Sequence, residues 1–380
     1  MKVLLIGELF SHNLGDQLIY YCTKRAVLSI DSQAQFVLLD IMGRKQSTVE
    51  NNAVNYDLLE GMSTRTPLWA ELCKNSVLNY LIKSKSLLGL QSYYKSLITP
   101  DIDVAIITGG ALIQDTFAVY LDAIMKLLKR NNIPVIFNAV GVGRKSWITK
   151  RILIRMLKRD NISGFSCRCL PERFDEIIPK ERTKVISSYD IAVFCGDAFD
   201  LSSEKNYTVG LGIMNFSRFS QQQLIDFWVD VIHDLDERGV GWKVFTTGSP
   251  EDGALAVKII KNIYAENYRN KIVIPANVEE LITIIHSFDR ILSFRLHSHI
   301  IAYALRIPSV GIVWDSKVSD FFNKINRGDS IFDITDPTDK IISSLIAQEP
   351  ISSEELLKVK EHASSVFFTL LNKALKRIEI

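Results

Sequence analysis

Several features that would assign a chain quickly to a class are scarce or missing in these 380 residues. The five cysteines are scattered and form no Cys-x-x-Cys pair, which is typical of reduced cytosolic thiols and argues against a disulfide framework or a zinc site. No uninterrupted apolar stretch approaches the roughly 20 residues that a membrane-spanning helix needs. The formal net charge is only +2, which is unlike a dedicated nucleic-acid-binding protein.

Familiar ligand motifs are missing too. The chain has no Gly-x-Gly-x-x-Gly dinucleotide fingerprint, no P-loop, and no His-x-x-x-His or compact carboxylate cluster for a metal. We therefore expect no bound cofactor and no metal site. The N-terminal stretch "MKVLLIGELF" contains Glu8 and no small-residue cleavage site, so it predicts a first strand rather than a signal peptide. A cytoplasmic protein is expected, with attachment to the inner face of the membrane as an open alternative.

Short apolar runs alternate with helical periodicity along most of the chain, 47% of which is hydrophobic. Continuous apolar strands separated by helices predict an α/β fold with parallel sheets covered on both faces. The first half predicts strands at 3–7, 36–39, 104–108, 135–139 and 191–194. The second half predicts strands at 209–214, 243–247, 272–274, 291–294 and 310–314, with helices near 220–238, 254–267, 278–287 and 296–305.

The polar stretch "FDLSSEKN" separates these two sets of strands. We therefore expect two Rossmann-like domains, 1–202 and 203–348, facing each other across a cleft. Residues 349–380 begin with the capping box Ser-Ser-Glu-Glu and predict a terminal helix that packs back on the first domain.

The stretch "SFRLHSH" gives the strongest functional signal, because a chain with only six histidines places two of them after one strand. Arg295 ends the strand and His297 falls in the first turn of the next helix, where backbone N–H groups favour an anion. Arginine adds a fork for carboxylate or phosphate. His297 and His299 are two residues apart and point roughly 200° away from each other on a helix, so only one, His297, should face the cleft.

Other candidates follow strands in the same way, each with an ordinary structural alternative. Asn13, Gly15 and Asp16 lie between the first strand and a helix starting near residue 17; Asp16 could accept a hydroxyl proton from a sugar or simply cap that helix. Gly109 and Gly110 allow close backbone approach or a tight turn.

Three further loops are less distinctive. Arg168 follows a short strand-like run, where an arginine is often only an ion-pair residue. Asp252, in "TTGSPEDG", could hold a ligand or cap a helix. Lys317, in "WDSK", either projects towards the same edge of the sheet as Arg295 or is an ordinary surface lysine.

These motifs together resemble those of the polysaccharide pyruvyl transferase family. The matching stretches, in order, are "NLGDQ" at 13–17, "TGGALIQD" at 108–115, "SFRLHSHIIAYALRIPSVGI" at 293–312 and "WDSK" at 314–317. The resemblance spans about residues 3–320. It departs from the family at Gly-Gly-Ala (109–111) and after Arg168, where "CLPERF" replaces an acidic residue and a serine.

The resemblance implies a fold like that of GT-B glycosyltransferases and transfer of pyruvate from phosphoenolpyruvate onto two hydroxyls of a sugar, as a ketal. The sugar acceptor would be a cell-surface glycan or its lipid-linked precursor. His297 and Asp16 would then be catalytic. The donor would be held by Arg295, Arg168, Lys317 and Leu296, and the acceptor by Asn13, Gly15, Gly109, Gly110 and Asp115.

Two alternatives remain open. A GT-B glycosyltransferase that uses a nucleotide sugar would suit the same fold and a basic second-domain site. In addition, the segments 72–100 and 144–159 are basic and amphipathic. They are either ordinary helices with a solvated basic face or surfaces for a membrane that carries the acceptor.

Overall fold

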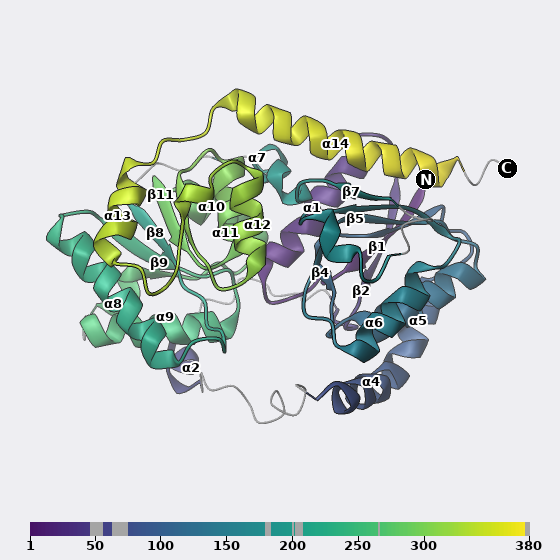
Figure 1. Cartoon of the computed structure of the whole chain (residues 1–380), viewed down its shortest axis with the longest axis horizontal. Coiled ribbons are helices and arrows are strands. Elements are labelled where there is room, and N and C mark those ends of the chain that lie inside the picture. Colours follow the sequence, from purple (N-terminus) through teal and green to yellow (C-terminus); the bar gives the residue numbers. More distant parts are fainter. Residues whose placement is uncertain are drawn as a thin grey trace.

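The computed structural model describes residues 1–45, 56–62, 75–178, 184–199, 201, 208–264 and 267–376. These residues form two parallel β-sheets with helices packed against them, arranged as two lobes side by side (Figure 1). The predicted fold class is confirmed: two Rossmann-like α/β domains face each other, as in GT-B enzymes.

The first sheet has the strand order β2-β1-β3-β5-β6-β7, and β4 pairs with β5. Its central strands are short apolar runs buried on both faces, as expected for a parallel sheet covered by helices. The strands are β1 (Lys2–Gly7), β2 (Gln35–Asp40), β3 (Val104–Ile107), β4 (Gly110–Ile113), β5 (Val135–Val142), β6 (Ile162–Cys167) and β7 (Val185–Ser187).

The second sheet has the strand order β10-β9-β8-β11-β12-β13. Its strands are β8 (Val209–Gly212), β9 (Trp242–Phe245), β10 (Ile272–Val273), β11 (Arg290–Ser293), β12 (Ser309–Ile312) and β13 (Ile331–Phe332). The helices after its strands are α8 (Gln221–Glu237), α9 (Pro250–Ile263), α10 (Val278–His286), α11 (Leu296–Ala304), α12 (Ser316–Lys324) and α13 (Thr338–Ala347).

The helices of the first half are α1 (Leu14–Leu28), α4 (Ser76–Leu97), α5 (Ala118–Arg130), α6 (Trp147–Leu157) and the short α7 (Cys195–Ala198). The predicted basic segments thus fall on α4 and α6, except that residues 72–74 lie outside the described residues. Throughout the described ranges, no helix combines the length and the apolar character needed to cross a membrane.

One predicted strand is wrong. Residues Ile191–Phe194 form a 3₁₀ turn instead, and the last strand of the first sheet is β7. The Asp190 side chain accepts a hydrogen bond from Ala192 N–H at 3.0 Å and starts this turn. An apolar run of four residues fits a buried strand or a buried helical turn equally well, so the run alone could not decide.

The C-terminal helix α14 (Ser353–Leu375) crosses back from the second lobe to the first, as predicted (Figure 1). It begins with the expected capping box between Ser352 and Glu355. On the first lobe it packs against β5 and β6 so closely that a side chain at Gly164 would collide with Leu370.

The two lobes share a buried junction. Helix α1 of the first lobe packs against α10 and α11 of the second, in one apolar cluster. The short helix α2 (Tyr56–Gly61) belongs to the first half of the sequence but packs on α9 in the second lobe. The next described helix, α4, packs on the first lobe again. The predicted domain boundary at residue 203 lies outside the described residues.

Candidate active site at the domain junction

The strand order places a topological switch point in each sheet, between β1 and β3 and between β8 and β11. In open parallel sheets, ligands bind beyond the carboxyl ends of the strands at such points. The stretches "NLGDQ" and "SFRLHSH" follow β1 and β11. The two strongest sequence candidates therefore come from the two positions where the fold itself favours a ligand.

The N-termini of α1 and α11 meet across the junction. A side chain at Gly15 would collide with the ring of His297, so only a glycine allows the two helices to approach this closely. Leu14 N–H donates to the Thr247 carbonyl at 2.8 Å, and the Thr247 hydroxyl donates to Asn13 Oδ1 at 3.1 Å. These contacts fix the first-domain loop against the second domain.

His297 lies beside a buried ion pair. Arg168, at the end of β6, pairs with Asp190, and both side chains are almost completely buried. His297 Nε2 is 3.3 Å from the Arg168 guanidinium and 3.8 Å from the Asp190 carboxylate. Burial opposes the charge on Asp190, but Arg168 and His297 together hold the pKa of that carboxyl below its usual range.

Arg295 is paired in a similar way. Arg295 is the N-cap residue of α11, but its side chain forms no capping hydrogen bond within the described chain. Its guanidinium binds Asp252 on α9 instead, with Nε 2.9 Å from the carboxylate Oδ2. Asp252 is buried and also accepts the Asn215 N–H at 2.8 Å. The Arg295 side chain keeps 20% of its surface exposed, so it can still reach a ligand.

Lys317 is the unusual cation of the site. Its ammonium lies 4.2 Å from the centre of the Trp314 ring, and none of the described carboxylates is within ion-pair distance. Burial lowers the pKa of the Lys317 ammonium to about 8; Asp315 and Asp16 oppose this shift, while Arg168 and Arg295 add to it. A half-buried cation with two arginines nearby favours an incoming anion.

A pocket opens next to these cations, between the two lobes. Leu296 lines it together with Arg168 and Lys317. Its remaining lining is Ala111, Gly141, Val142, Cys169, Tyr189, Asp190, Ile300, Ser316, Asp320, Phe321 and Lys324. The donor-binding candidates therefore meet at one place in the fold, with Arg295 beside it.

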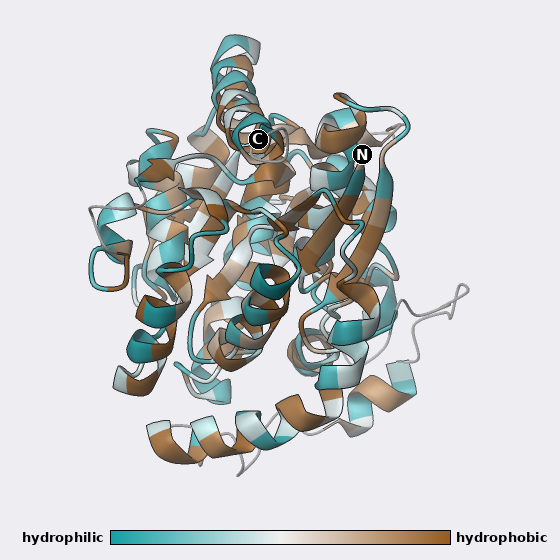
Figure 2. Cartoon of the chain, turned by 90° about the vertical axis from the view of Figure 1, so that its right-hand side faces the viewer, coloured by the Kyte–Doolittle hydropathy of each residue, from teal (hydrophilic) through white to brown (hydrophobic). Residues whose placement is uncertain are grey.

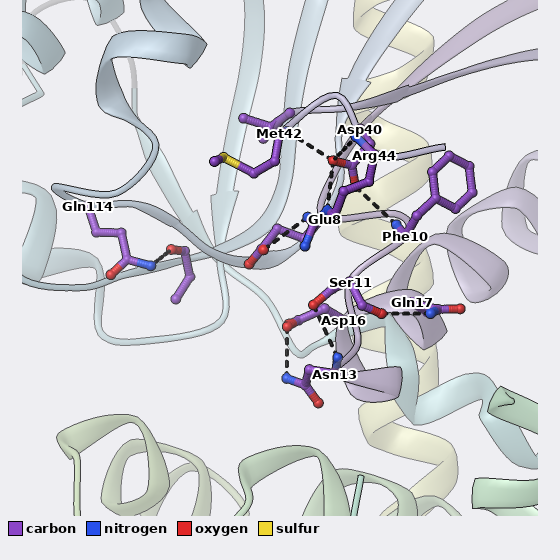
Figure 3. Close-up of polar contacts among 12 residues, drawn as sticks. Glu8, Phe10, Ser11, Asn13, Asp16, Gln17, Asp40, Met42, Arg44 and Gln114 are labelled. Carbon is purple, nitrogen blue, oxygen red and sulfur yellow. Dashed lines mark hydrogen bonds and ion pairs between the residues drawn. The ribbon is translucent and has the colours of Figure 1, made fainter. Parts of the chain in front are cut away.

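The first-domain half of the site is a polar group of side chains near the ends of β1 and β2 (Figure 3). Asn13 donates to the Asp16 carboxylate at 2.8 Å, and Arg44 pairs with Glu8 at 3.1 Å and with Asp40 at 3.0 Å. Burial and then the nearby Asp16 carboxylate raise the pKa of Glu8 to about 7, against the attraction of Arg44.

The glycine pair after β3 also belongs to this half. Gly110 has a φ of +92°, which favours glycine, and a Cβ at this position would lie 3.9 Å from Asp16 Oδ1. Asp115 is different: its carboxylate accepts the Ser146 N–H at 2.8 Å and lies 3.8 Å from Arg144. These contacts hold the loop before α6, and the structure does not bring Asp115 to the other candidates.

His299 lies in the core, away from His297. It is fully buried, and its Nε2 lies 3.0 Å from the Ser293 carbonyl. Burial lowers the pKa of His299 to about 4. This histidine therefore stays neutral and supports the loop between β11 and α11.

Two structural alternatives from the sequence are corrected. Helix α1 begins at Leu14 and is capped by Asn13, so Asp16 lies inside the helix and does not cap it. Likewise α9 begins at Pro250, and Asp252 is not a cap but the partner of Arg295. In both places the helix starts earlier than the apolar periodicity indicates.

Sequence reasoning missed Asp190, the buried partner of Arg168. The available signal was weak: a single acidic residue in front of an apolar run. Among the described residues, no three His, Cys, Asp or Glu side chains gather as a metal site would require.

A family model described as polysaccharide pyruvyl transferase matches residues 13–316, a range that contains nearly all of this geometry. The chain belongs to the polysaccharide pyruvyl transferase family. Membership of this family implies a transferase. The predicted resemblance is thus confirmed, although a search of curated protein sequences gave no match.

Solved structures show the fold. The S. aureus MnaA–UDP complex is similar with a TM-score of 0.59 and 10% identity, covering 99% of this chain and 97% of the other. A putative UDP-N-acetylglucosamine 2-epimerase from Listeria monocytogenes gives 0.58 at 8% identity, covering 99% and 97%. Spinosyn rhamnosyltransferase SpnG gives 0.52 at 9% identity, covering 98% and 100%. At such low identity these structural neighbours establish the two-domain architecture alone.

Proposed function

We propose that this protein transfers the pyruvyl group of phosphoenolpyruvate onto two hydroxyls of a sugar and forms a pyruvate ketal. The family supports this reaction class. The observation that carries the proposal is Lys317, a half-buried ammonium with arginines nearby and no ion-paired carboxylate among the described residues. Phosphoenolpyruvate brings a phosphate and a carboxylate, which are the two anions that such a group of cations binds.

The donor lies between the two lobes in this proposal. Arg295 and Arg168 bind its carboxylate and phosphate, and Lys317 adds a third positive charge. The N-terminus of α11 supplies backbone N–H groups at Leu296 and His297. Each charge-assisted contact contributes about 1.5–3 kcal/mol, so the loss of one weakens donor binding by at least tenfold.

The reaction needs an acid first. Protonation of the methylene carbon of the donor makes a methyl group and leaves positive charge at C2. A sugar hydroxyl adds to C2 and loses its proton, the C–O bond to phosphate breaks, and a second hydroxyl closes the ketal as it too loses a proton. The two hydroxyls therefore release two protons, which balance the one added to the methylene carbon and the one taken up by the leaving phosphate, so inorganic phosphate leaves as its monohydrogen dianion.

His297 is the acid in this scheme. A guanidinium can only donate, so in its contact with Arg168 the Nε2 atom accepts. An anionic donor attracts the Arg168 guanidinium, so His297 Nε2 loses this hydrogen-bond donor and can take up a proton. The Asp190 carboxylate, 3.8 Å from Nε2, then stabilises the protonated ring. Donor binding and protonation of the acid are thereby coupled. Loss of a general acid typically lowers the rate about 10²–10⁴-fold.

The acceptor occupies the first-domain side. Asn13, Gly15, Gly109 and Gly110 form its surface, and Asp16 accepts a hydroxyl proton. The acceptor is a cell-surface glycan or its lipid-linked precursor. Asp115 supports this side indirectly, because its carboxylate fixes the loop before α6.

A thermal-shift titration with phosphoenolpyruvate, with UDP-glucose and UDP-galactose in parallel, tests the proposal. A ligand at 100 times its dissociation constant stabilises the folded chain by about 2.7 kcal/mol. We expect stabilisation by phosphoenolpyruvate alone. Stabilisation by a nucleotide sugar alone would contradict the proposal and point to a GT-B glycosyltransferase.

A further inference from the structure

Helix α4 has an outer face that does not match an ordinary surface helix. Three of its large apolar side chains are at least half exposed: Val77 at 51%, Leu81 at 56% and Leu88 at 69%. A surface helix normally places polar residues on its solvent side. Figure 2 shows α4 as the long helix along the lower edge of the molecule, with hydrophobic residues along much of its length.

These side chains share one side of the helix. At about 100° per residue, Val77, Leu81 and Leu88 fall within about 40° of one another, and Lys85 and Lys95 fall within the same sector of about 80°. Both lysines are exposed. We call these five residues the outer face of α4.

The opposite side of α4 is occupied by the protein itself. Tyr94 is fully buried and its hydroxyl bonds to the Ile41 carbonyl, while Leu90 and Leu97 pack into the core of the first domain. The helix packs there against α5, α6 and β2. The outer face therefore cannot turn inward, because the helix is already fixed by its inner face.

The charge of α4 decides which partner fits. Residues 75–100 contain three lysines and no acidic residue. Two of these lysines stand on the outer face between and beyond the apolar side chains. Lysines interleaved with leucine and valine on one side of a helix are typical of helices that lie in an anionic lipid surface, where the apolar groups enter the acyl boundary and the ammonium groups reach the headgroups.

The second basic segment shares this property only at Trp147, which is 56% exposed and lies under Arg151. On α6 and just after it, Arg155 and Arg159 both pair with Asp122, and Lys150 pairs with Glu176. These three cations already have partners within the protein. The outer face of α4 thus differs from the other basic segment in having three apolar side chains that are at least half exposed, where α6 has one.

We propose that the outer face of α4 docks the protein on the surface of an anionic phospholipid bilayer. The helix lies in the plane of the surface, with Val77, Leu81 and Leu88 in the acyl boundary and Lys85 and Lys95 at the phosphate groups. This binding does not depend on the proposed pyruvyl transfer.

Vesicle flotation with the full-length chain tests this proposal. We expect binding to vesicles that contain phosphatidylglycerol, weakened by salt, and little binding to pure phosphatidylcholine. The triple variant Val77→Ser/Leu81→Ser/Leu88→Ser should lose binding. The variant Lys85→Gln/Lys95→Gln removes no buried contact and should bind roughly tenfold or more weakly.

Matched controls come from α14. Leu357 is 54% exposed and Lys373 is exposed there, so Leu357→Ser and Lys373→Gln should bind vesicles as the unchanged protein does. Equal binding of all variants, or no binding of the unchanged chain to either vesicle, would overturn the proposal. So would a dimer in gel filtration that the triple variant splits, since the face would then bind a second copy.

Discussion

The Nε2 atom of His297 lies 3.8 Å from the Asp190 carboxylate, which comes from the opposite lobe and is also the counter-ion of Arg168. The same carboxylate therefore serves two groups that we assign to different steps, donor binding and proton transfer. Replacement of Asp190 by asparagine should separate them.

In Asp190→Asn we expect kcat to fall by about 10²-fold or more because the acid loses its partner, while the KM for the donor does not rise, since Arg168 is released to bind it. Steady-state phosphate release with an isolated acceptor glycan measures both constants. The thermal midpoint without donor should also fall, because Arg168 remains buried without a counter-ion. A raised donor KM with unchanged kcat would contradict this division.

Arg295 and Asp252 make a second separable pair. Arg295→Ala should weaken donor binding at least tenfold and also destabilise the fold, because a buried carboxylate is left unpaired at a cost of about 3–5 kcal/mol. In Arg295→Ala/Asp252→Asn the amide oxygen can still accept the Asn215 N–H, so stability should recover. Donor affinity should stay low in this double variant, because the guanidinium that binds the donor is still missing. Recovery of both in the double variant would show that Arg295 has only a structural role.

Lys317 should make donor binding depend on pH. Burial holds the pKa of its ammonium at about 8 in the free protein, and only the charged form attracts the donor, so donor binding should weaken as pH rises above about 8. The donor phosphate keeps its charge there, because its second ionisation lies near pH 6. Lys317→Arg stays charged and should show a flat profile in the same titration. An identical pH dependence in this variant would assign the effect to another group.

Gly15 should tolerate no side chain. In Gly15→Ala the added methyl group collides with the His297 ring and displaces it, so kcat should fall while the donor KM changes little. Gly89 on α4 is the matched control, because a methyl group there meets no atom within 4 Å. Gly89→Ala should retain full kcat. Equal kcat in both variants would mean that the His297 ring position is not critical.

Much of the fold could be predicted from periodicity. Apolar runs located most strands of both sheets because parallel strands are buried on both faces. The capping box at Ser352 located the start of α14. The 3₁₀ turn Ile191–Phe194 was mistaken for a strand, because four apolar residues carry no period of their own.

The site was predictable in part. The sequence places three candidates shortly after predicted strands, namely Arg295, His297 and Lys317, and the structure brings them together. Their partners were not predictable, because the pairs Arg168–Asp190 and Arg295–Asp252 join residues that are 22 and 43 positions apart. Pairing at that range depends on how the elements pack, which local pattern does not specify.

The most direct test of the account is isothermal titration of the full-length protein with phosphoenolpyruvate, comparing the unchanged chain with His297→Gln and Lys317→Met. We predict one binding site, an affinity in His297→Gln close to that of the unchanged chain, and at least a tenfold loss in Lys317→Met. The absence of binding to the unchanged chain, or full affinity in Lys317→Met, would contradict the placement of the donor among these cations.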